Sequence, residues 1–186
     1  MVTLTSLWMP IVLSAVGVFF LSAIIHMLLN IHGKDYSQMP NEAAVLGAIR
    51  DQEPAPGFYT LPYLTDFKQL EDPDVKANYE AGPVAFVTVM PGGLPKMGKA
   101  LGQWLVMCVI VSVFVAYVAG RTLSGGAEYL TVFRLVGTTA FLAYAGSVAT
   151  ESIWKGQPWA NSCRHIFDGL LYSLVTAGFF GWLWPA

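Results

Sequence analysis

Four long stretches of this chain carry no charged side chain, and this pattern constrains the fold more than any motif does. Asp, Glu, Lys and Arg are absent before Lys34, between Lys99 and Arg121, between Arg134 and Glu151, and after Asp168. A transmembrane helix takes about 20 mostly apolar residues, and each stretch supplies a segment of roughly that length. Charged residues make up only 12% of the chain, whereas an average soluble domain has roughly 25%. The sequence therefore predicts four membrane spans.

Each predicted span is expected to be an α-helix, because lipid offers no partner for an unpaired backbone N–H or C=O. A transmembrane barrel would instead show alternating strands of about 10 residues. The first stretch is not interpreted as a cleaved signal peptide, since it lacks a basic start and a small-x-small cleavage site. The predicted fold class is an all-α membrane protein, a bundle of four transmembrane helices. The spans are Leu7 to Asn30, Leu101 to Gly120, Tyr129 to Thr150 and Ile166 to Trp184.

The tryptophans support these span ends independently, because an indole ring prefers the interface between membrane and water. All six lie at or just outside a predicted end, and none lies in the middle of a span. We interpret them as interface anchors: Trp8, Trp104, Trp154, Trp159, Trp182 and Trp184.

Basic residues predict the orientation, since they are enriched on the cytoplasmic side. The side that holds the first and third loops has the larger share of them near the span ends: Lys34, Lys96, Lys99, Lys155 and Arg164. The other side has Arg121 and Arg134. Both termini are therefore predicted to lie on the non-cytoplasmic side.

Residues 31–100 form the one sizeable polar region, which follows the first span (residues 1–30) and precedes the other three (residues 101–186). We expect a loop of mixed helical and extended structure there. Asn41 is a plausible N-cap for a short helix to about Gln52, and helical turns are expected on both sides of Pro73. A strand is expected in "PVAFVTVMPGG", with "GFYTL" as its candidate partner. Six basic and nine acidic residues leave no basic stripe, so nucleic-acid binding is not predicted.

Polar groups inside a span are expensive, so each of them suggests a functional hypothesis. His26, Glu151 and Asp168 are predicted to lie at similar depth on the loop side. Such a cluster could relay a proton, or bind a metal ion if Ser22 or His165 completed it. The structural alternative is that Arg164 pairs with Asp168 along one helix face, while Glu151 lies in water and His26 bonds to a neighbouring helix.

The structural alternative is favoured, and no metal or cofactor is predicted. The sequence has no HxxxH or HxxE pair, and His26 and His32 are expected on different faces. Arg134, one to two turns into the third span, is the clearest intramembrane charge. A bare arginine facing lipid costs about 2.5–3.5 kcal/mol or more, so we expect it to reach the headgroups or a partner.

Small residues repeat every four positions in three of the spans, which predicts close helix crossings in a compact bundle. The predicted packing positions are Ser112, Ala116 and Gly120; Thr139, Ala143 and Ser147; and Ala177 and Gly181.

Four segments of the chain, "PNEAAVLGAIR", "FVTVMPGG", "VFRLVGTTAF" and "FDGLLYSLVTAGFFGWLWP", resemble a family of small bacterial membrane proteins with four spans and no assigned activity. The resemblance covers the chain from about residue 6 onward. It implies a location in the bacterial cytoplasmic membrane, and it supplies no catalytic residues to transfer and no mechanism.

The sequence favours a non-catalytic integral membrane protein, an accessory or structural subunit of a larger bacterial complex of the respiratory or photosynthetic type. Its expected partners are the lipid bilayer and other membrane subunits. The alternative is a small transporter or proton-conducting protein that uses His26 and Asp168. An enzyme built on His26, Glu151 and Asp168 lacks a nucleophile and a cofactor motif, and is therefore not predicted.

Overall fold

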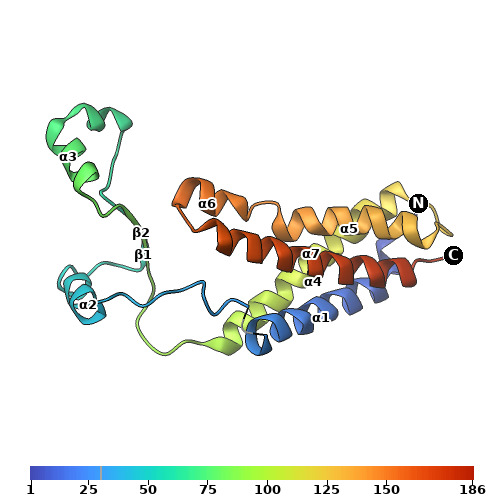
Figure 1. Ribbon diagram of the computed structural model, residues 1–186. Coiled ribbons are helices and arrows are strands. Elements are labelled where there is room, and N and C mark those ends of the chain that lie inside the picture. Colours follow the sequence, from blue (N-terminus) through green and yellow to red (C-terminus); the bar gives the residue numbers. More distant parts are fainter. Residues whose placement is uncertain (30) are drawn as a thin grey trace. The chain divides into compact units, whose positions relative to one another are not determined.

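The computed structural model describes residues 1–29 and 31–186, and the chain divides into two units. The first unit comprises Met1–Tyr36 and Lys96–Ala186 and is a helical bundle. The second unit, Ser37–Pro95, holds short helices and a hairpin (Figure 1). Residues 31–36 thus belong to the bundle, and Asn30, the predicted end of the first span, lies outside the described residues.

Three of the described helices are long and apolar enough to cross a membrane. The first, Leu4–Leu28, consists of η1 (Leu4–Leu7), α1 (Trp8–Ala23) and η2 (Ile24–Leu28). The second is α4 (Met97–Thr122). The third, Tyr129–Lys155, consists of α5 (Tyr129–Ala145) and α6 (Ala149–Lys155). The protein is therefore mostly helical and has the apolar helices of a membrane protein.

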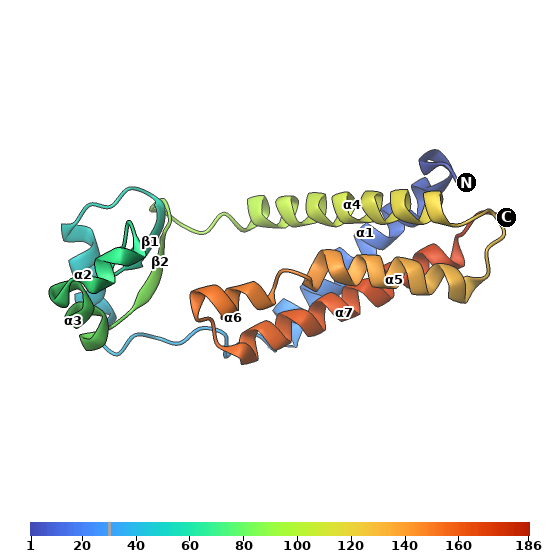
Figure 2. The ribbon, with the colours of Figure 1, turned by 90° about the horizontal axis from the view of Figure 1, so that it is seen from above.

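The last helix of the bundle, α7 (Trp159–Trp182), is 24 residues long but less apolar than the other three. It packs along α5 and also contacts α1, which in turn packs against α4 (Figure 2). The core between the helices contains Leu7, Val115, Val136 and Phe180, all fully buried or nearly so.

Small residues lie at the helix crossings, as the sequence predicted for α4 and α7. Ser112, Ala116, Gly120 and Ala177 are buried. At Gly181 an added Cβ would lie 2.7 Å from the Tyr129 ring, and at Gly169 it would lie 2.8 Å from the Cβ of Ala145. These distances are shorter than a normal carbon contact, so the helices approach as closely as glycine permits.

The prediction that Thr139, Ala143 and Ser147 form a packing stripe on the third span was wrong. Ala143 and Ser147 are exposed, and Thr139 is partly buried. Helix α5 ends at Ala145, so Ser147 lies in a turn beyond it. A four-residue spacing can be drawn on either face of a helix, and a different face of α5 packs inward. The buried positions of α5 are Val132, Val136, Ala140 and Ala145.

The tryptophans divide into two groups. Trp8, Trp154, Trp159 and Trp182 are exposed, and Trp184 donates its indole N–H to the Ser124 carbonyl at 2.9 Å. Trp104 differs, because its indole N–H donates to Ser22 Oγ at 2.7 Å, inside the bundle. Arg134 is exposed on α5, and no other residue in the described part of the chain forms an ion pair with it.

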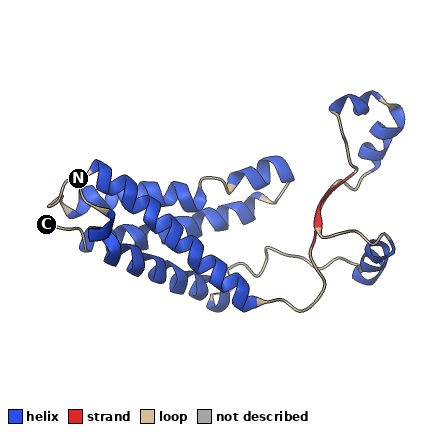
Figure 3. Cartoon of the chain, turned by 180° about the vertical axis from the view of Figure 1, so that it is seen from behind, coloured by secondary structure: helices blue, strands red, loops and turns tan. Residues whose placement is uncertain are grey.

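The second unit is built from short helical segments and one hairpin. Helix α2 (Glu42–Asp51) begins after Asn41, whose side chain accepts the N–H of Ala44. The turn η3 (Phe67–Glu71) and helix α3 (Pro73–Ala81) lie on either side of Asp72. Strands β1 (Gly57–Leu61) and β2 (Ala85–Val89) pair antiparallel, with Tyr59 opposite Val87 (Figure 3).

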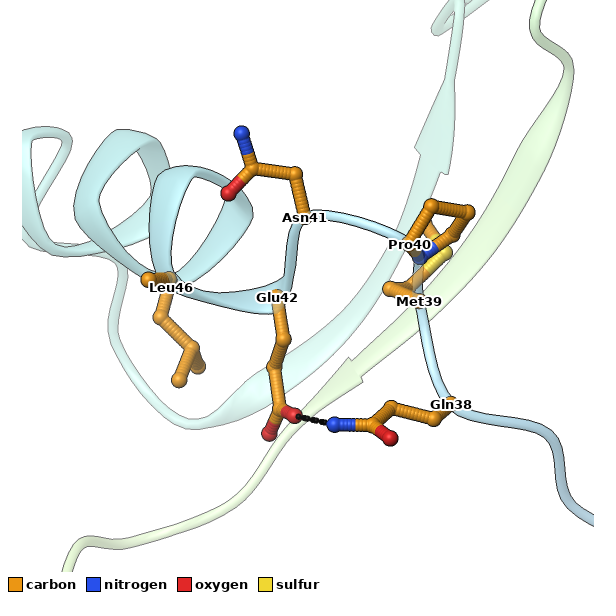
Figure 4. Close-up of a pocket in the computed structure, with 7 residues that line it drawn as sticks. Gln38, Met39, Pro40, Asn41, Glu42 and Leu46 are labelled. Atoms are coloured by element: carbon orange, nitrogen blue, oxygen red, sulfur yellow. Dashed lines mark hydrogen bonds between the residues drawn. The ribbon is translucent and has the colours of Figure 1, made fainter.

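Within 37–95, all of which is described, no residue is fully buried. A hollow lies at the start of α2, where Gln38 donates to Glu42 at 3.0 Å (Figure 4). Its lining residues are Gln38, Met39, Pro40, Asn41, Glu42, Ala43 and Leu46. Glu42 is the one titratable residue in this lining.

Candidate metal centre

Six polar side chains meet at one end of the bundle, and we call them the histidine–aspartate centre. They come from the end of the first apolar helix, from the turn that follows it, and from the first turns of α7. The members are His26, His32, Asp35, Arg164, His165 and Asp168.

His32 lies between two carboxylates. Its Nδ1 is 2.6 Å from Asp35 Oδ2 and its Nε2 is 2.8 Å from Asp168 Oδ2. The side chain is 11% exposed. Ionised carboxylates only accept hydrogen bonds, so the ring satisfies both of them when both nitrogens carry a proton. Each carboxylate also fixes the orientation of the imidazole.

Two further imidazoles lie beside His32. The His26 ring is 4.2 Å from the His32 ring and the His165 ring is 4.8 Å from it, with interplanar angles of 23° and 30°. His26 Nε2 is 3.5 Å from Asp168 Oδ2, and His165 Nε2 is 3.7 Å from Asp35 Oδ2. Three imidazoles therefore surround two acidic groups.

Arg164 positions Asp35. Its Nε and Nη2 lie 2.6 and 2.5 Å from Asp35 Oδ1, while Asn161 donates to the Asp35 carbonyl at 3.0 Å. Burial works to raise the pKa of Asp35, but hydrogen bonds from His32 and Arg164 and the charge of Arg164 outweigh it and lower that pKa. Asp35 therefore presents an ionised Oδ2 to the histidines while Oδ1 is held by Arg164.

Asp168 is the most deeply buried acid of the centre, with 3% of its side chain exposed. Its Oδ2 faces His26, His32 and His165. Among the described residues, nothing hydrogen-bonds to its Oδ1. A buried carboxylate oxygen without a partner is costly, so this atom is available for a ligand.

The centre offers two overlapping sets of metal-ligating atoms. His26, His32 and Asp168 form one set, and His32, Asp35 and His165 form the other. Within each set the ligand atoms all lie within 4.8 Å of one another. Imidazole and carboxylate are the ligands of many zinc sites. A carboxylate on the second nitrogen of a ligating histidine is the usual outer partner in such sites.

The structure brings together part of the predicted polar cluster. His26 and Asp168 meet, as expected at similar depth. Glu151 does not join them, because it pairs with Lys155 at 2.8 Å along α6. Arg164 pairs with Asp35 in place of Asp168, because the turn after the first helix carries Asp35 onto α7. The predictions that Glu151 joins the cluster and that Arg164 pairs with Asp168 were therefore wrong.

The prediction that His26 and His32 point to different faces was also wrong. The helix ends at Leu28, so the spacing of a helix no longer applies at position 32. The predicted cluster lacked His32 and Asp35, and a repeated sequence motif could have pointed to them. The chain contains His-x-x-Asp twice, as His32 to Asp35 and as His165 to Asp168.

Comparison of the chain with protein-family models, with curated proteins and with solved structures finds no match. The resemblance to a bacterial four-span family stays a prediction.

Proposed function

We propose that this protein is a four-span integral membrane protein that binds a divalent transition-metal ion, such as Zn²⁺, at the histidine–aspartate centre. The observation that carries the proposal is Asp168, which is buried, faces three imidazoles and has one oxygen without a partner among the described residues. Its ligands would be Asp168, His26 Nε2 and His32 Nε2, the first set of ligating atoms.

Two neighbours support the ion from outside its ligand set. Asp35 contacts Nδ1 of His32. This contact would orient the imidazole ring and make Nε2 a stronger metal ligand. Arg164 holds Asp35 in place. His26 is 40% exposed, so an ion has access from water, and three protein ligands leave a coordination position for water.

The proposed topology includes α7 as the fourth span. Helix α7 packs along α5 and also contacts α1, both of which belong to apolar helices of spanning length. The distribution of basic residues supports a bacterial cytoplasmic-membrane protein with both termini on the non-cytoplasmic side. In this topology the centre opens toward the cytoplasm.

Metal binding is tested with purified protein in detergent after treatment with a chelator. Zn²⁺ is titrated against a competing chromophoric chelator, and Co²⁺ absorption reports the ligands. Asp168→Asn is expected to weaken Zn²⁺ binding at least 10-fold. Glu151→Gln is the matched control, since Glu151 lies outside the centre and is exposed.

Two outcomes would overturn the proposal. One is wild-type protein that binds no Zn²⁺ above the background of a His26→Ala, His32→Ala, His165→Ala triple variant. The other is Asp168→Asn protein that binds as tightly as the Glu151→Gln control. Circular dichroism of each variant checks that the helices are retained.

A second candidate function is that of an accessory subunit, and the second unit favours it. Residues 37–95 bury no residue fully, although large apolar side chains such as Phe58, Phe86 and Leu61 are exposed there. An apolar surface of this kind is typical of a contact with a partner. A stoichiometric membrane partner that copurifies in mild detergent, and is lost when 37–95 is deleted, would support this role.

A further inference from the structure

Each ring nitrogen of His32 faces a ligand set of its own. Asp168 lies at Nε2 and Asp35 lies at Nδ1. His26 belongs to the set with Asp168 and His165 to the set with Asp35, and His165 Nδ1 is also 3.9 Å from Asp168 Oδ2. The two sets share no other residue. A single ion cannot use both nitrogens of one imidazole, because their lone pairs point away from each other. One metal ion would therefore leave half of the centre unused.

We propose that the centre binds two divalent transition-metal ions and that the imidazolate of His32 bridges them. This inference rests on the proposed function, since the first ion is the one described above. The second ion would bind His32 Nδ1, Asp35 Oδ2 and His165 Nε2, the second set. Nitrogen ligands favour late first-row ions, such as Cu²⁺, Zn²⁺ and Co²⁺, over Mg²⁺ and Ca²⁺.

The proton balance of binding is simple and involves no change of oxidation state. With a proton on each ring nitrogen, His32 can donate to both carboxylates. As the ions bind, both N–H bonds break, both protons pass to water, and two N–metal bonds form. Asp35 Oδ2 and a carboxylate oxygen of Asp168 then contact the ions in place of the protons.

The two ends of the bridge differ at the carboxylates, because Arg164 holds Oδ1 of Asp35, whereas Oδ1 of Asp168 has no partner among the described residues. His32 is fixed by a carboxylate at each nitrogen, and Arg164 leaves only Oδ2 of Asp35 free for the second ion. His26 and His165 are 40% and 41% exposed. Their rings can therefore turn from the stacked arrangement toward an ion, and water or hydroxide can complete each coordination shell and offset its charge.

The test is the number of ions per chain in the purified, full-length protein. After Zn²⁺ loading and gel filtration, wild type and Glu151→Gln are expected to retain two ions. His26→Ala is expected to retain one, on the Nδ1 side. His165→Ala and Asp35→Asn are expected to retain one, on the Nε2 side. Two variants on the Nδ1 side keep the test informative if either fails to fold.

Cu²⁺ loading tests the bridge itself. Two Cu²⁺ ions joined by an imidazolate couple magnetically, so the electron paramagnetic resonance signal of the fully loaded protein should integrate to clearly less than two spins. Full intensity at two coppers per chain would overturn the bridge. One ion in wild type, with His165→Ala unchanged, would overturn the second site and leave the proposed function standing, whereas no ion at all would overturn both.

Discussion

Helices α5 and α7 approach closely at Gly169, and adding one methyl group there gives a quantitative test of the bundle. In Gly169→Ala the new Cβ would lie 2.8 Å from the Ala145 Cβ and 3.3 Å from the Ala145 backbone nitrogen. Rotating a side chain cannot relieve this clash, so the helices must separate. Overpacking of this kind costs about 1–3 kcal/mol.

Gly178→Ala is the matched control on the same helix, because an added Cβ there meets nothing within 4 Å in the described structure. Both substitutions gain helix propensity, worth about 0.5–1 kcal/mol. That gain cancels when the two variants are compared. The difference in their free energies of unfolding is therefore the packing cost alone, with Gly169→Ala the less stable.

The assay is thermal unfolding in detergent. Unfolding is detected by the reactivity of the Cys108 thiol, which is fully buried in the folded protein, in a Cys163→Ser background. A cost of 1–3 kcal/mol corresponds to a difference in Tm of about 2–12 °C for a chain of this size. Equal Tm values for Gly169→Ala and Gly178→Ala would refute the described contact between α5 and α7.

Cysteine labelling should distinguish the exposed Cys163 from the buried Cys108: a maleimide is expected to modify the first in folded protein and the second only after unfolding, and equal rates would contradict the described core. Acid should destabilise the metal-free protein below about pH 4. The pKa of Asp35 is lowered on folding, so its stabilising contribution is present above the unfolded pKa and is lost as the pH falls through the folded pKa. Melting curves across this range should show a weaker acid dependence for Asp35→Asn, and an unchanged dependence would argue against the Asp35 contacts. Ser112→Ala removes the 3.1 Å hydrogen bond to Ser14 and is expected to lower stability by about 1 kcal/mol or less, measured by denaturant titration in detergent; a larger loss would indicate a further role for that hydroxyl.

The features that could be predicted from the sequence are those that depend on neighbouring residues. The N-cap at Asn41, the pairing of "GFYTL" with "AFVTV" and the apolar helices follow from capping groups, β-branched residues and the absence of charge. These features depend on residues close in the chain, or on composition over about 20 positions. They could therefore be predicted without a tertiary structure.

The centre could be predicted only in part, because it depends on contacts across the chain. His32 and Asp168 are 136 positions apart, and they meet only because the chain turns after Leu28 and lies against the start of α7. The predicted span ends placed His26 and Asp168 at similar depth, and the two side chains meet. Helical spacing could not place Asp35, because no periodic pattern governs a turn between a helix and a loop.

Buried apolar side chains fill the interior of the bundle beyond the histidine–aspartate centre. Phe180 is fully buried on α7, twelve positions and about 18 Å beyond Asp168 along the helix axis. Val136 of α5 and Val115 of α4 belong to the same buried core between the helices. The histidine–aspartate centre thus lies at one end of the bundle, with packed apolar side chains between it and the other end.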